Sequence, residues 1–116
     1  MRFLTLVTTT NNPGAPPPAM VEAIEKAMME GMKNKMVLDG GELGGASVSR
    51  VFRLKGGKVT DGPYAEAKEV AGGYAILEYA SHESALKGSR EWMEMHATHW
   101  PAWEGTVQLL PIVAHR

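Results

Sequence analysis

Apolar residues follow two spacings along this 116-residue chain. Two stretches repeat them at i, i+3 and i+4, which is the spacing of an amphipathic helix. One helix is predicted to begin near Pro18, and the other to run from an N-cap at Ser81 to about His96 or a little beyond. Runs rich in β-branched or alternating apolar residues predict strands at 2–9, 36–38, 73–79 and 106–113. The elements therefore follow the order β-α-β, hairpin, β-α-β.

The hairpin is predicted between the two halves of this pattern. Residues 47–54 and 58–60 form its arms, and Gly56-Gly57 supplies the two positive-φ residues of a tight turn. An earlier glycine-rich stretch, 40–45, ends the short strand at 36–38. No Lys-Ser/Thr pair follows these glycines and no helix pattern opens there, so a connecting turn is favoured over a phosphate-binding loop.

Each predicted helix has an apolar stripe that should face the core. The stripe of the first helix consists of Met20, Val21, Ile24, Ala27, Met28, Gly31 and Met32. The stripe of the second consists of Ala85, Leu86, Ser89, Trp92, Met93 and His96. Pro101 disfavours helical geometry at Trp100, so the second helix should end before that residue.

This order predicts a single α+β domain over residues 1–116, a ferredoxin-like sandwich in which both helices cover one sheet face. A monomer would then expose the other face, which soluble monomers rarely tolerate when it is strongly apolar. We therefore expect a two-fold homodimer whose sheets meet around a partly polar cavity. The residues expected on that face are Phe3, Val7, Tyr74, Ile76, Leu110 and Ile112, with Thr5, Glu78 and Gln108.

Composition narrows the function classes. Twelve basic residues nearly balance thirteen acidic ones, and a net charge of -1 gives no field that would attract nucleic acid. The absence of cysteine excludes disulfides, thiolate nucleophiles and sulfur-ligated metals. The sequence has no long apolar stretch, so we expect no membrane partner and a cytoplasmic location. No motif indicates a cofactor.

The segment Asp61-Gly62-Pro63-Tyr64-Ala65-Glu66-Ala67-Lys68-Glu69, followed by Gly72-Gly73-Tyr74, resembles the DGPF-domain proteins, a branch of the YCII-related family. The similarity extends along nearly the whole chain and includes the late segment His99-Trp100-Pro101-Ala102-Trp103-Glu104-Gly105. The resemblance implies a dimeric α+β barrel, a fold shared with small isomerases, lactone-processing enzymes and monooxygenases. It also implies an alternative role, since some DGPF proteins are linked to sigma-factor regulation.

Two departures from the family pattern concern chemistry. Tyr64 stands where the family name has phenylalanine, and Ala67 stands where many members have threonine. Catalytic YCII-related members resemble one another in a His-Asp pair whose histidine lies early in the chain. Here every histidine is late, at positions 82, 96, 99 and 115, so that pair has no counterpart.

The turn after the hairpin offers the first candidate site. Gly62 and Pro63 force a sharp bend beside Asp61, whose carboxylate could act as a general base or simply cap the turn. Three further residues, Tyr64, Glu66 and Lys68, are candidates for substrate binding. The alternatives are a buried tyrosine ring and an exposed ion-pair cluster.

His96 and His99 offer the second candidate site, in which one of them would do acid–base work, because imidazole as a group titrates near neutral pH. Their i, i+3 spacing could also hold a metal with Glu94 or Glu104, but the motif is incomplete, and no metal site is predicted. Trp100 and Trp103 could stack on a flat ligand or pack beneath the helix end.

Three roles remain open from the sequence. The first is a small-molecule-binding dimer with acid–base chemistry of the isomerase or lyase type, in which Asp61 works with His96 or His99. The second is a non-catalytic binding or regulatory protein that uses the same cavity or an exposed edge. The third is a structural dimerisation module. None of the three names a substrate.

Overall fold

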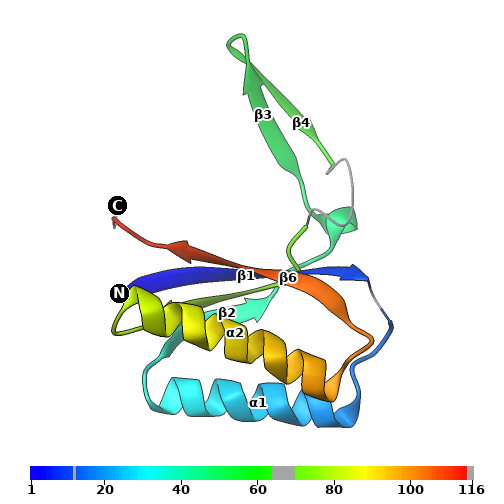
Figure 1. Ribbon diagram of the computed structural model, residues 1–116. Helices are drawn as coiled ribbons and strands as arrows, with labels where there is room; N and C mark the ends of the chain where they lie inside the picture. The colour runs from blue at the N-terminus through cyan, green and yellow to red at the C-terminus, as the bar shows by residue number, and fades with distance from the viewer. Residues whose placement is uncertain (12, 64–69, 115–116) are drawn as a thin grey trace.

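The computed structural model describes residues 1–11, 13–63 and 70–114. Within these ranges the helices and strands follow the predicted order (Figure 1). They are β1 (Arg2–Asn11), α1 (Pro18–Lys33), β2 (Val37–Glu42), the 3-10 helix η1 (Ala46–Val48), β3 (Val51–Lys55), β4 (Lys58–Gly62), β5 (Gly73–Glu78), α2 (His82–His99) and β6 (Glu104–Pro111).

The main sheet has the strand order β2-β5-β1-β6, with antiparallel pairing throughout. Strand β1 is central, because it pairs with β5 on one side and β6 on the other. Both helices lie on one side of this sheet (Figure 1). The predicted α+β class is therefore confirmed.

Strands β3 and β4 form a separate two-stranded ribbon that projects from the side opposite the helices (Figure 1). Gly56 and Gly57 occupy its tight turn with φ of 57° and 76°, as the sequence predicts. We call residues 50–62 the arm.

The faces of β1 are assigned the wrong way round by the sequence prediction. Phe3 is fully buried on the helix side, where its ring packs against Tyr79 and His82. Thr5 and Val7 alternate with the same parity, so they also face the helices. Both parities of β1 are apolar, which is why periodicity could not choose between them.

The opposite side of the sheet, which we call the open face, carries Leu4 and Leu6 from β1. Directly paired residues of antiparallel strands share a face, so the register adds residues from three more strands. These are Tyr74, Ile76 and Glu78 of β5, Gln108 and Leu110 of β6, and Asp39 and Gly41 of β2. Five of the nine expected residues thus lie on the open face, whereas Phe3, Val7 and Thr5 do not, and Ile112 lies just beyond the end of β6.

The predicted turn at Gly40-Gly41 is also wrong, because β2 continues through both glycines. A Cβ at Gly40 would come within 3.2 Å of the Tyr74 carbonyl oxygen, and one at Gly41 within 3.3 Å of the Tyr74 ring. The glycines therefore allow β5 and the Tyr74 side chain to approach β2 closely.

The helix stripes are buried less than their spacing predicts. Met20 and Gly31 in α1, and Ala85 and His96 in α2, are buried as expected. Val21, Met32 and Leu86 are instead exposed. Each helix thus faces the sheet with a stripe that is narrower than the apolar pattern suggests.

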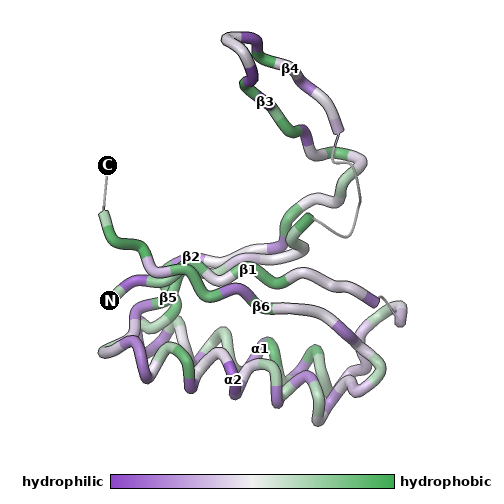
Figure 2. The backbone as a smooth tube through the Cα atoms, turned by 45° about the horizontal axis from the view of Figure 1, so that its top comes forward, coloured by the Kyte–Doolittle hydropathy of each residue, from purple (hydrophilic) through white to green (hydrophobic). Residues whose placement is uncertain are grey.

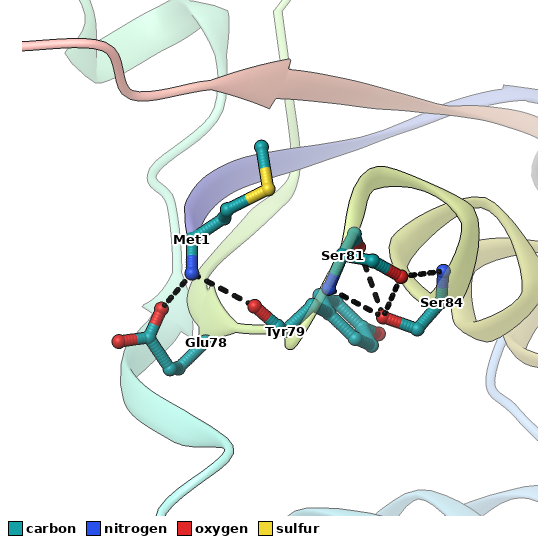
Figure 3. Close-up of polar contacts among 5 residues, drawn as sticks. All are labelled: Met1, Glu78, Tyr79, Ser81 and Ser84. Carbon is teal, nitrogen blue, oxygen red and sulfur yellow. Dashed lines mark hydrogen bonds and ion pairs between the residues drawn. The ribbon is translucent and has the colours of Figure 1, made fainter.

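Polar contacts fix the start of β1 and the start of α2 (Figure 3). The ammonium group of Met1 donates to the Tyr79 carbonyl oxygen and pairs with Glu78, both at 2.8 Å. Ser81 caps α2 as predicted: its hydroxyl accepts from the Ser84 backbone N–H, and the Ser84 hydroxyl accepts from the Ser81 N–H. Trp100 has non-helical geometry just after α2.

The chain exposes more surface than a compact monomer of its mass. Its accessible surface is 8383 Å², whereas a 12.6 kDa monomer is expected to expose about 6,200 Å². Its radius of gyration is 16.0 Å, against about 13 Å for a compact domain of this length. Hydrophobic segments lie along both the sheet and the arm (Figure 2). A single copy therefore leaves much of its apolar surface uncovered.

Within the described ranges, no helix is long and apolar enough to cross a lipid bilayer.

Removing the Ser81 cap should destabilise the chain. Ser81→Ala is expected to lower the free energy of unfolding by about 1 kcal/mol, because a helix N–H loses its acceptor. This corresponds to a fall of about 4 °C in the melting temperature, measurable by circular dichroism. The control is Ser47→Ala, at an exposed serine of η1, which should change stability by less than about 0.5 kcal/mol. Equal effects of the two substitutions would contradict the capping role.

Glu78 should make the free energy of unfolding depend on pH in the acidic range. Its hydrogen bond to the Met1 ammonium lowers the pKa of Glu78 below the ordinary 4.5. Because the folded-state pKa is depressed, the stabilisation is present above pH 4.5 and is lost as the pH falls through the folded value. Urea unfolding of the wild type and Glu78→Gln should thus differ at neutral pH and converge in acid. A difference in unfolding free energy between the two proteins that stays constant from neutral pH into acid would contradict the ion pair.

Candidate functional site

Asp61 forms an ion pair at the root of the arm, and neither of the two pockets described below includes it. The Arg50 guanidinium contacts both carboxylate oxygens, with Nε 3.0 Å from Oδ1 and Nη2 2.9 Å from Oδ2. Both side chains are about half exposed, so this bidentate pair fixes geometry more than it adds stability. The arm lies on the opposite side of the sheet from α2 (Figure 1). One copy of the chain therefore does not bring Asp61 to His96 or His99.

The other residues proposed for the turn, Tyr64, Glu66 and Lys68, lie outside the described residues.

His96 is the most strongly constrained of the predicted site residues. It lies in the last turn of α2 and is only 6% exposed. Its Nδ1 is 2.9 Å from the carbonyl oxygen of Trp92. A carbonyl oxygen can only accept, so Nδ1 carries the hydrogen and the neutral ring has its lone pair on Nε2. Among the described residues, Nε2 has no hydrogen-bond partner.

Two tryptophan rings pack against the His96 imidazole. Its centroid lies 5.4 Å from that of Trp92 and 4.6 Å from that of Trp103. Trp103 is itself fixed, because its Nε1–H donates to the Thr9 hydroxyl at 3.0 Å and its ring stacks on Trp100. The two tryptophans proposed for binding thus support the histidine, and Trp103 also faces a pocket.

That pocket, which we call the His96 pocket, has a volume of about 360 Å³ and opens to solvent. It lies where the end of α2 meets the start of β6. Its lining combines an imidazole, an indole and a carboxylate with small and apolar residues: Met93, His96, Ala97, Pro101, Trp103, Glu104 and Gly105. Glu104 is oriented by Asn11, whose side-chain N–H donates to Glu104 Oε1 at 2.9 Å. His99 is half-buried but does not line this pocket.

A second open pocket, of about 440 Å³, continues along α2 and β6 and shares Met93 with the first. Ser89 lines it, and the Ser89 hydroxyl is buried without a hydrogen-bond partner among the described residues. Lys87 and Arg90 give this pocket a basic rim.

The described part of the chain contains no group of three histidine, aspartate or glutamate side chains placed to hold a metal. The alternative in which His96 and His99 share a metal with Glu94 or Glu104 therefore has no support from the geometry.

The open face carries a polar pair that sequence reasoning missed. The Tyr74 hydroxyl donates to Asp39 Oδ2 at 2.9 Å. This hydrogen bond to a carboxylate, with smaller effects of burial and negative charge, raises the pKa of Tyr74 above the ordinary 10.0. Asp39 lies 35 residues before Tyr74, and only the pairing of β2 with β5 reveals their contact.

Comparison of the sequence with models of known protein families and with curated proteins gave no match.

The Trp92 carbonyl should fix one tautomer of His96. In the neutral ring we expect Nδ1 to be protonated and Nε2 to be bare, because only Nδ1 has an acceptor. Long-range 1H–15N correlation spectra at mildly alkaline pH distinguish the two nitrogens. His82, whose ring has no hydrogen-bond partner among the described residues, is the internal control and should show the ordinary tautomer mixture. A protonated Nε2 in neutral His96 would contradict the assignment.

Proposed function

We propose that this chain is a small-molecule-binding protein of the DGPF branch of the YCII-related family. In this proposal each copy is a ferredoxin-like domain with an inserted hairpin, and two copies form a cytoplasmic dimeric α+β barrel. The activity is acid–base chemistry of the isomerase or lyase type on a small carbonyl-bearing or aromatic molecule.

The observation that carries the proposal is that, among the described residues, only one ring nitrogen of His96 has a hydrogen-bond partner. Trp92 fixes the proton on Nδ1, and the bare Nε2 belongs to a ring that lines an open pocket. Such a nitrogen can take a proton from a bound molecule and return it at another atom. The Trp103 ring offers an apolar wall for a flat ligand.

The fold part of the proposal rests on strand order and on the uncovered sheet. The order β2-β5-β1-β6, with a helix after β1 and after β5, is that of a split β-α-β unit repeated once. The excess surface of the single copy and the apolar residues of the open face favour a two-fold partner. In that dimer the Tyr74–Asp39 pair would line the enclosed space.

A non-catalytic binding or regulatory role, of the kind linked to sigma factors, is the second candidate. The ion pair between Arg50 and Asp61 favours it, because both carboxylate oxygens are already hydrogen-bonded to the guanidinium. In this alternative Asp61 has a structural role and no catalytic one.

A thermal-shift screen with carbonyl-bearing and aromatic metabolites tests the proposal. A compound present at 100 times its Kd should stabilise the wild type by about 2.7 kcal/mol. His96→Gln should reduce the affinity at least about tenfold, which is the loss expected when one hydrogen bond to the ligand is removed. The matched control is His82→Gln, at an exposed histidine of the same helix, which should bind as the wild type does.

Deuterium exchange into the bound compound then separates the two candidates. The acid–base proposal expects His96-dependent exchange of a ligand C–H with D2O, followed by NMR. Binding without exchange would support the regulatory role, and binding unaffected by His96→Gln would place the ligand elsewhere.

A further inference from the structure

The arm has one apolar face and one polar face. Paired residues share a face, so Phe52 and Leu54 of β3 lie on the same side as Val59 of β4. These three side chains are 68%, 73% and 68% exposed. Asp61, which is paired with Phe52, lies on this face too, at the root of the arm. The other face carries Arg53, Lys55, Lys58 and Thr60, with Val51 and Gly62 at the root. The arm thus has the alternation of a ribbon that is covered on one side only.

None of the described elements of a single copy covers the apolar face of the arm, as the exposure of its three side chains shows. The ribbon projects from the main sheet and hydrogen-bonds to neither of its edges (Figures 1 and 2). An isolated two-stranded hairpin is only marginally stable in water. A partner surface is therefore expected to stabilise it.

The charge of the arm indicates what that partner is. Residues 50–62 contain four basic side chains and one acidic side chain, a net charge of +3. Since the whole chain has a net charge of -1, the rest of it carries -4. The arm is therefore attracted to the body of another copy of this chain, and complementary charge favours such an encounter.

We infer that the apolar face of each arm docks on a second copy of this chain. The arm projects from the same side of the molecule as the open face (Figure 1), so one two-fold association covers both surfaces. The inference rests on the dimer of the proposed function. It adds that the arm of each copy packs on the other copy, and we call this contact the clasp. The Arg50–Asp61 ion pair joins the two strands at the root of the arm, and Asp61 lies on the same face as Phe52.

Sedimentation analysis of two matched substitutions tests the clasp. Phe52→Asp places a carboxylate on the apolar face, and Thr60→Asp places one on the polar face of the same ribbon. Phe52→Asp should raise the dimer Kd at least about tenfold, whereas Thr60→Asp should leave it within about threefold. Val59→Asp is a second variant with the same expected loss. Circular dichroism checks that each variant keeps the fold.

The outcomes separate the clasp from the dimer itself. A wild-type dimer that Phe52→Asp and Val59→Asp leave unchanged would overturn the clasp alone, and the arm would be free for a different partner. A wild type that stays monomeric at micromolar concentration would overturn the dimer of the proposed function, and the clasp with it. Loss of dimer in all three variants would show a general charge effect and would also overturn the clasp.

Discussion

A four-stranded sheet has two faces, and this chain provides helices for only one of them. Phe3, Met20 and Ala85 are buried between the helices and that face, and they form the fully buried apolar core of the described residues. Among the described residues, no helix or second sheet covers Leu4, Leu6 and their neighbours on the other face. An antiparallel sheet can leave one face to water, but a face with this many apolar residues favours a further layer. The proposed dimer would supply that layer from a second copy.

The sheet also separates the two regions where chemistry is proposed. His96 lies on the helix side, held by the Trp92 carbonyl and the Trp103 ring. Asp61 and the Tyr74–Asp39 pair belong to the side without helices. Association of two copies would enclose the second region but would leave the first open at the end of α2. A ligand at the His96 pocket and an interface at the open face are therefore compatible in one molecule.

The sequence predicts the order of elements because each carries its own local signal. The Ser81 cap, the Gly56-Gly57 turn and the stop before Pro101 depend on neighbouring residues, and all three are confirmed. The faces of β1 were not predictable, since apolar residues occupy both parities. Leu86 and Met32 fit their helical stripes but are exposed. The spacing of apolar residues shows which side of a helix faces the core, but it does not show how much of that side the sheet covers.

The candidate site was predictable only in part. His96 stands out as a histidine on an apolar stripe, and it is buried as that stripe suggests. Its partner atom, a backbone carbonyl, has no signature in the sequence. The partners of Asp61 and Tyr74 are side chains 11 and 35 residues away, brought close by strand pairing alone. Such contacts depend on register, which local pattern does not determine.

In the proposed dimer, a second copy covers the open face. Isotope-filtered NOE spectroscopy on a mixture of 13C-labelled and unlabelled chains tests it most directly, because it detects only contacts between copies. The methyl groups of Leu6 and Ile76, which lie on adjacent strands of that face, should both show intermolecular NOEs. Contacts within single chains only, together with the tumbling rate of a 12.6 kDa molecule, would contradict the account.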